Sequence, residues 1–244
     1  MRIQGGKAIY GASLGILMLD ARFPRIVGDM GNAATFPFPV QYRLVGGASP
    51  DRVVRHNAEG LLENFIEAAR DLRRHGVDGI TTNCGFLSLF QSELAAAVDI
   101  PVATSSLMQV PAVNALLPPG KCAGVLTISG STLTSAHLTN AGVPQDTPLG
   151  TTEGGKEFTR AILGDEYSLD VALAQEDNVV AATDLCGRHP EVGAIVLECT
   201  NMTPYAAAIS AATGRPVFSM VNFVSWFQSG LAPASTSGIS HDRV

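Results

Sequence analysis

Two stretches of this chain repeat each other, and this repeat decides the fold. Residues 77–106 read VDGITTNCGFLSLFQSELAAAVDIPVATSS, and residues 192–221 read VGAIVLECTNMTPYAAAISAATGRPVFSMV. The two stretches align without a gap at a constant offset of 115 residues. Cys84 therefore corresponds to Cys199 and Pro101 to Pro216, and each cysteine precedes its proline by 17 residues. Self-similarity of this kind indicates two copies of one structural unit.

Each copy has the same internal order of elements. An apolar run predicts a buried strand, a cysteine-bearing turn follows, and a helical stretch leads to a second strand that begins with proline. The rest of the chain alternates in the same way. Strands are expected at residues 12–19, 40–45, 122–128 and 149–152, with helices between them. Alternating strands and helices are typical of parallel sheets joined by right-handed crossovers, so the fold class is α/β.

The sequence Pro118-Pro119-Gly120 interrupts this pattern, which then restarts. We expect a first α/β domain from residues 1–117 and 217–244, and a second from residues 118–216. Within the first domain, a helix is expected to begin at Ser49-Pro50-Asp51 and to end at Gly76. Residues 20–39 are rich in proline and glycine, and a loop of this length is often functional, for example as a lid over an active site.

Composition excludes several classes of function. The 244 residues carry a net charge of −6, with 46% hydrophobic and 16% charged residues, which describes a globular chain without the basic face of a nucleic-acid binder. No apolar run is long enough to cross a membrane and no signal pattern is present, so a cytoplasmic location is expected. The five histidines form no metal-binding motif, and phosphate-binding and dinucleotide-binding glycine motifs are missing. We therefore expect neither a metal nor a cofactor.

The positions of the paired cysteines indicate a catalytic site. Ligands of parallel α/β sheets bind at the carboxyl ends of strands, so each copy of the repeat places one thiol at the ligand-binding edge. Two pseudo-symmetric halves would direct Cys84 and Cys199 into one cleft. Buried cysteines are often inert, but two at equivalent repeat positions favour a catalytic role. Cys122 and Cys186 have no such partners and are interpreted as structural.

Two opposed thiols suit inversion of a carbon centre. Racemisation needs a base on one face of the α-carbon and an acid on the other. A helix start after each cysteine is expected to lower the pKa of the thiol toward neutrality. The enolate formed needs hydrogen-bond donors, and small polar residues that flank both cysteines are available; the same residues also suit helix capping.

The motifs Thr82-Asn83-Cys84-Gly85 and Glu198-Cys199-Thr200-Asn201 resemble the paired motifs of the aspartate/glutamate/hydantoin racemase superfamily. The segments 124–132 and 15–20 extend the resemblance, which covers residues 15–231. It implies two Rossmann-like domains with the active site in the cleft between them, and no pyridoxal phosphate or metal. It implies a racemase or epimerase with Cys84 and Cys199 as catalytic bases. The substrate-binding residues that it implies are Asn83, Gly85, Thr200, Asn201, Ser129, Thr132 and Asp20, the last being equally well explained as a solvated acid.

Departures from the family pattern limit the substrate. Glutamate racemases commonly carry a histidine where this chain has Asn201, and an asparagine after the first cysteine, whereas Asn83 precedes it. Another amino acid, a hydantoin or a related acid is therefore favoured. Arg25 and Arg43 are candidate partners for a second carboxylate, although surface placement is favoured for both.

Three alternative functions stay open. Two belong to the same fold: a maleate-type cis–trans isomerase, and an arylmalonate-type decarboxylase, whose relatives keep only one cysteine. The third is a small-molecule binding protein that closes as a clamp. By analogy with the family, the chain is expected to form a homo-oligomer and to bind a small carboxylate, with no nucleic-acid or membrane partner.

Overall fold

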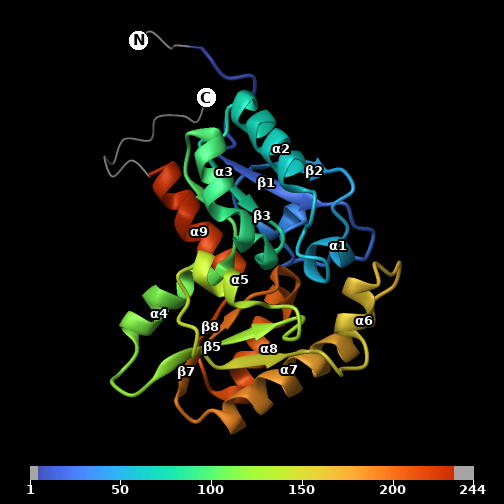
Figure 1. Ribbon diagram of the computed structural model, residues 1–244, viewed down its shortest axis with the longest axis vertical. Helices are drawn as coiled ribbons and strands as arrows, with labels where there is room; N and C mark the ends of the chain where they lie inside the picture. The colour runs from blue at the N-terminus through green and yellow to red at the C-terminus, as the bar shows by residue number, and fades with distance from the viewer. Residues whose placement is uncertain (1–4, 234–244) are drawn as a thin grey trace.

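The computed structural model describes residues 5–233 and arranges them in two lobes stacked one on the other (Figure 1). Each lobe contains a four-stranded parallel sheet, with the orders β2-β1-β3-β4 and β6-β5-β7-β8. The α/β class with two parallel sheets is confirmed. The strands are β1 (Leu14–Leu19), β2 (Val40–Val45), β3 (Gly79–Thr82), β4 (Val102–Ala103), β5 (Cys122–Thr127), β6 (Leu149–Thr151), β7 (Val192–Leu197) and β8 (Val217–Phe218).

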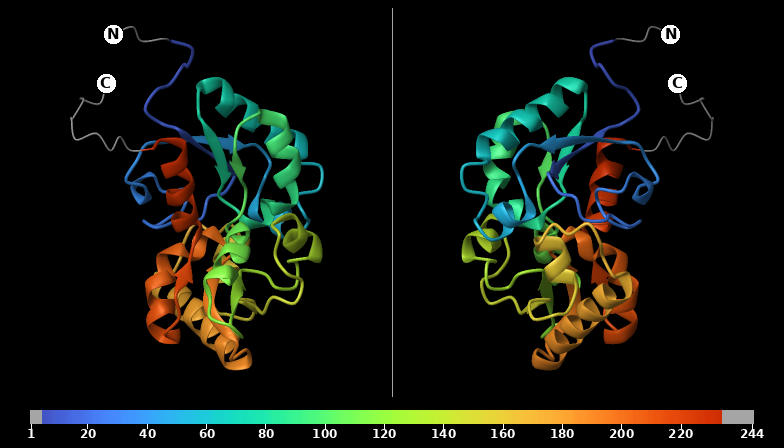
Figure 2. Two further views of the ribbon diagram at one scale, coloured as in Figure 1. Left: turned by 90° about the vertical axis from the view of Figure 1, so that its left-hand side faces the viewer. Right: turned by 90° about the vertical axis from the view of Figure 1, so that its right-hand side faces the viewer.

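Helices cover both faces of the first sheet. Figure 2 shows α9 on one face and α2 and α3 on the other. Side chains alternate accordingly along β1: Leu14 and Ile16 pack with Val224 of α9, whereas Leu17 and Leu19 join the core that contains Phe65 of α2. The helices of this lobe are α1 (Pro50–Val54), α2 (Leu62–His75), α3 (Gln91–Val98) and α9 (Met220–Leu231).

The second lobe has α7 against β5 and β6, with α4 also in contact with β5. Its helices are α4 (Val110–Leu116), α5 (Ser135–Asn140), α6 (Phe158–Leu163), α7 (Val171–Arg188) and α8 (Ala206–Thr213). Short 3-10 helices are η1 (Ala33–Thr35), η2 (Gly85–Phe90), η3 (Ser106–Gln109) and η4 (Thr200–Tyr205). Across residues 5–233, no helix combines the length and hydropathy needed to cross a bilayer.

The repeat is preserved element by element. An offset of 115 residues carries η2 onto η4, α3 onto α8 and β4 onto β8 without any shift of their bounds. The residues that end α3 and α8 also correspond. Asp99 and Gly214 both adopt the left-handed conformation, with φ of 53° and 66°. The two cysteine-bearing turns therefore occupy equivalent places in the two lobes.

Two expectations from the sequence are wrong. The helix expected from Ser49 to Gly76 is two helices, because Asn57, Ala58 and Gly60 have positive φ values of 51°, 52° and 73° and cannot continue a right-handed helix. The boundary placed at residue 217 is also displaced. Val217–Phe218 forms β8 beside β7, so the second sheet includes it, and the chain rejoins the first lobe only with α9.

Candidate active site

A small pocket lies where the two lobes meet, at the carboxyl ends of both sheets. Its walls come from the segments that follow β1, β3, β5 and β7, while α1 and α6 add apolar side chains. In each sheet the central pair, β1 with β3 and β5 with β7, is where the chain reverses its direction of winding. Open α/β sheets bind ligands at this switch point. The cavity volume is only about 20 Å³, about the room of one water molecule, so the pocket walls must separate before a small molecule can bind.

The structure brings Cys84 and Cys199 together in this pocket. Both are buried, with 8% and 6% of their surface exposed, and both line its wall. Backbone amides of the turn after each cysteine favour its thiolate form. They belong to Phe86 and Leu87 for Cys84, and to Asn201 for Cys199. The start of each 3-10 helix thus faces a sulfur atom.

The ionisation of the two thiols differs from the expectation. Burial, reinforced by the nearby Glu198 carboxyl, raises the pKa of Cys84 to about 12 and that of Cys199 well above its usual value. The amides at the helix starts act in the opposite direction, but they are outweighed by desolvation. Both thiols are therefore protonated at neutral pH, and the expected lowering of the thiol pKa is wrong for this state.

Glu198 is a buried acid beside both cysteines, at the repeat position equivalent to Asn83. Its Oε2 accepts a hydrogen bond of 2.7 Å from the Thr127 hydroxyl, and its Oε1 has no hydrogen-bond partner. Burial raises the pKa of Glu198 to about 7. A Cβ atom on Gly85 would lie 2.2 Å from Oε1, so only glycine allows the two cysteine motifs to approach this closely.

The long segment 20–39 contributes to the wall of the pocket. Phe23 and Arg25 line it, with the Arg25 guanidinium 4.4 Å from the centroid of the Phe23 ring. The side chain of Arg25 is only 13% exposed, and its Nη1 forms a 3.0 Å ion pair with Asp29. Surface placement of Arg25 is therefore wrong. Arg43 does lie at the surface, where it pairs with Asp71 at 2.8 Å.

A chain of polar contacts connects this segment to the second cysteine. The Asn201 amide donates to the Asp29 carboxylate, and the Cys199 thiol donates to Asn201 Oδ1 at 3.5 Å. Asp29 is buried at 3% exposure and also accepts the backbone amide of Gly31. Arg25, Asp29 and Asn201 consequently hold one another in place along one side of the pocket.

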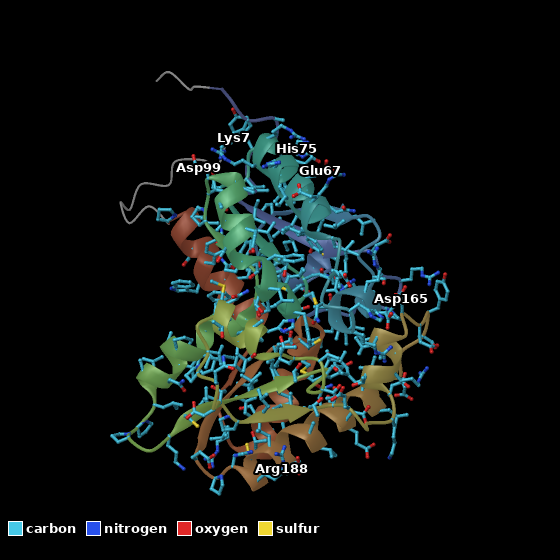
Figure 3. The ribbon with its side chains drawn as sticks, in the orientation of Figure 1. Lys7, Glu67, His75, Asp99, Asp165 and Arg188 are labelled. Atoms are coloured by element: carbon cyan, nitrogen blue, oxygen red, sulfur yellow. The ribbon has the colours of Figure 1, made fainter. Side chains whose placement is uncertain are left out.

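Hydrogen bonds and an ion pair made by Asp165 join segment 20–39 to the second lobe. Asp165, which lies just after α6, accepts the backbone amides of Arg22 at 2.5 Å and Phe23 at 3.2 Å, and its second oxygen pairs with Arg22 Nε at 3.0 Å. Figure 3 shows Asp165 at the edge of the molecule where α6 of the second lobe faces the first. These Asp165 contacts fix the backbone at Arg22 and Phe23, immediately before the pocket residue Arg25.

Four of the predicted substrate-binding residues line the pocket: Asn83, Gly85, Thr200 and Asn201. Thr200 also ties the two motifs together, because its hydroxyl donates to the Asn83 carbonyl at 2.6 Å. The Asn83 side-chain oxygen accepts the Leu19 amide at 2.8 Å, which fixes the orientation of this side chain.

The other three predicted residues lie outside the pocket wall. Asp20 is exposed to solvent, as expected of a solvated loop acid. Ser129 donates to Glu153 at 2.6 Å, and Thr132 donates to Ser129 at 2.8 Å, so both hydroxyls are engaged in a cluster within the second lobe. A substrate-binding role for these three residues stays a prediction.

Reasoning from sequence did not assign pocket roles to Phe23, Asp29 and Glu198, and it named Arg25 only as a candidate carboxylate partner with surface placement favoured. Glu198 had a signal, because a charged residue inside an otherwise buried motif is unusual. Phe23 and Asp29 had only their place in a long loop, which says nothing about which side chains turn inward. Among residues 5–233, no group of three or more potential metal-ligating side chains comes together.

Comparison with known proteins connects this geometry to enzymes. No protein-family model matches the sequence. Among curated proteins, a dimethylsulfoniopropionate lyase from Durusdinium sp. clade D is 29% identical, over 94% of this chain and 78% of that protein. Dimethylsulfoniopropionate lyase 6 of Emiliania huxleyi (strain CCMP1516) is 30% identical, over 86% of this chain, and the chain spans only 57% of that relative.

Solved structures show the same fold at low identity. Allantoin racemase from Klebsiella pneumoniae superposes with a TM-score of 0.62 at 18% identity, covering 96% of both chains. Unliganded arylmalonate decarboxylase gives a TM-score of 0.56 at 15% identity, with 92% of this chain and 94% of that chain covered. The chain therefore has the fold of the superfamily of racemases and decarboxylases that its cysteine motifs resemble.

Proposed function

We propose that this protein is a cofactor-independent lyase that removes a proton from the α-carbon of a small carboxylate and expels a β-sulfonium group, with dimethylsulfoniopropionate as its substrate. The observation that carries the proposal is the meeting of Cys84 and Cys199 in one buried pocket. The racemase predicted from the sequence shares the first step, proton removal, but its second step returns a proton to the same carbon instead of expelling a group.

The chemistry of the substrate fits a thiolate base. Dimethylsulfoniopropionate has a carboxylate at one end and a sulfonium on the β-carbon. When a base takes an α-proton, the electron pair of the C–H bond forms the C=C bond, and the C–S bond breaks with its electrons leaving on sulfur. The products are acrylate and dimethyl sulfide, and the proton on the base returns to water. No redox partner is needed.

Cys84 is the better placed of the two cysteines to act as the base. Two backbone amides, from Phe86 and Leu87, stabilise its thiolate, and the positive charge of Arg25 acts in the same direction. Cys199 has one such amide, from Asn201, and its ionisation is opposed by both Glu198 and Cys84. We assign it the role of the neutral thiol that donates a hydrogen bond to the carboxylate as negative charge develops there.

A cationic substrate explains how so buried a thiol can ionise. Three acidic groups, Cys84, Cys199 and Glu198, have their anionic forms suppressed by burial. A sulfonium entering the pocket supplies the missing positive charge and lowers the pKa of its neighbours. A dicarboxylate such as glutamate would add negative charge instead. This difference supports the lyase over an acidic amino-acid racemase.

Inversion of an amino acid is the second candidate, favoured by the equivalence of the two cysteines in the repeat and by the fold. One experiment separates the two reactions. The purified protein is incubated in D₂O with dimethylsulfoniopropionate, or with D- and L-amino acids and hydantoins, and monitored by proton NMR and headspace gas chromatography. The lyase predicts equal amounts of acrylate and dimethyl sulfide. Deuterium incorporation with inversion of an amino acid, and no elimination, would establish the racemase in its place.

A further inference from the structure

The pocket contains two buried atoms without hydrogen-bond partners, one on a guanidinium group and one on a carboxyl group. Among the described side chains, six buried nitrogen or oxygen atoms have no partner, and only two of these belong to residues that line the pocket. They are Arg25 Nη2 and Glu198 Oε1. A buried polar group without a partner is costly, and a charged one more so. Such groups at a pocket wall indicate places where a ligand completes the bonding.

The Arg25 end suits an anion. Asp29 engages Nη1 at 3.0 Å, so the guanidinium is held firmly while Nη2 stays free. The ring of Phe23 lies against one face of the guanidinium, and Asn32 anchors the backbone by donating to the Arg25 carbonyl at 2.9 Å. A guanidinium fixed in this way donates strong hydrogen bonds to a carboxylate.

The Glu198 end suits a cation that has no hydrogen to donate. Oε1 is enclosed by Gly85 and lies in a pocket whose remaining wall is largely apolar, including Phe23 and Phe86. A methylated onium group gains from a buried carboxylate and from aromatic faces without needing hydrogen-bond acceptors in fixed directions. Primary amines would leave N–H groups unsatisfied among these apolar side chains.

We infer that Arg25 and Glu198 recognise the two ends of a small zwitterion, with the substrate carboxylate at Arg25 Nη2 and a methylated onium group beside Glu198 Oε1. This inference rests on the proposed function and names the residues that select its substrate class. Neither residue moves a proton from carbon: Arg25 binds and orients, and Glu198 supplies the counter-charge.

Binding of two unreactive, isosteric ligands tests the inference. The ligand 3-(trimethylammonio)propionate carries both charges, and 4,4-dimethylpentanoate has the same shape without the cation. Isothermal titration calorimetry at pH 7 on the wild-type protein is expected to show at least about tenfold tighter binding of the zwitterion. Measured in two buffers of different ionisation enthalpy, only the zwitterion should release protons, because the onium favours the ionised form of Glu198.

Two variants separate the two ends of the ligand. Arg25→Gln should weaken binding of both ligands by a similar factor, about tenfold or more. Glu198→Gln should leave 4,4-dimethylpentanoate nearly unchanged, remove the preference for the zwitterion and reduce proton release. Arg43→Gln, at a surface arginine paired with Asp71, is the matched control and should bind both ligands as the wild type does.

The inference is overturned if wild-type protein binds neither ligand, binds both equally, or if Arg25→Gln binds both with wild-type affinity. The wild-type affinity ratio and proton release decide the matter even if Glu198→Gln does not fold. Because the ligands are not turned over, these results are independent of catalysis. A protein that binds the zwitterion as described but never eliminates dimethyl sulfide would disprove the proposed lyase activity and leave the recognition intact.

Discussion

At the scale of single residues, the site depends on a contact between its two halves. Gly85 comes directly after one cysteine and Glu198 directly before the other, and the Glu198 backbone oxygen would lie 2.3 Å from a Cβ atom at position 85. Backbone atoms cannot move aside as the end of a flexible side chain can. The glycine therefore keeps the two cysteine motifs at their working distance.

Replacement of this glycine tests that contact. Gly85→Ala should destabilise the protein by about 1–3 kcal/mol through overpacking and should lower kcat/KM by displacing Glu198 and Cys84. Gly187→Ala is the control, since that glycine lies in α7 with open space around it, and alanine there should be neutral or stabilise by about 0.5–1 kcal/mol. Thermal melting and steady-state kinetics measure both effects. A Gly85→Ala protein as stable and active as the wild type would contradict this description of the contact.

The scale of elements shows what sequence can and cannot provide. The repeat placed both cysteine turns, both succeeding helices and both proline-led strands, because period and turn residues are local signals. The break between α1 and α2 was missed, because Asn57 and Ala58 adopt left-handed conformations that their neighbours in the fold impose. The inward turn of Arg25 was missed for a related reason: its partner Asp29 is local, but the pocket that it faces is built by both lobes.

Asp165 is one of the residues that hold segment 20–39 over the pocket. Asp165→Ala removes the acceptor for the amides of Arg22 and Phe23, so the segment should open more often. We expect KM to rise several-fold to about tenfold, with a smaller change in kcat, because binding requires the closed segment.

Two further variants control this experiment. Asp165→Asn keeps one oxygen acceptor and the tolerance of asparagine for positive φ, and should lie between alanine and the wild type. Asp184→Ala removes an exposed partner of Arg188, which Figure 3 shows at the opposite end of the second lobe, and should leave KM unchanged. Equal KM values for all four proteins would show that Asp165 does not hold segment 20–39 closed for substrate binding.

At the scale of the whole molecule, burial between the lobes determines the ionisation of the two thiols. The sequence predicted helix starts that lower the thiol pKa, and the amides are present, but desolvation depends on how completely the two lobes enclose the sulfur atoms. The extent of this desolvation is set only when the two lobes assemble, so the sequence pattern did not reveal it. The same effect acts on His137, which is fully buried at the start of α5 with its ring nearly perpendicular to that of Phe86.

His137 makes the folding stability of the protein depend on pH. Burial lowers the pKa of His137 to about 4, against about 6.5 in an unfolded chain. Between these values the unfolded state binds more protons, so stability is lost as pH falls from about 6.5 to 4. His137→Gln keeps a side chain able to complete the capping box with Thr134 and does not titrate. Urea denaturation from pH 7 to 4.5 should show a steeper loss for the wild type than for this variant.

Glu198 has the opposite trend, because its raised pKa makes stability fall as pH rises from about 4.5 to 7. It is present in both proteins, so its contribution cancels in the comparison. Parallel loss of stability in the wild type and His137→Gln would contradict the role given to the histidine.

The central claim is that Cys84 and Cys199 carry out the chemistry, and the most direct test is acrylate formation from dimethylsulfoniopropionate by four single variants. Cys84→Ser and Cys199→Ser should each lower kcat by about 10²–10⁴-fold while their melting temperatures stay near that of the wild type. Cys122→Ser and Cys186→Ser, at the two cysteines outside the pocket, should retain full activity. Turnover at the wild-type rate by either Cys84→Ser or Cys199→Ser would contradict the account.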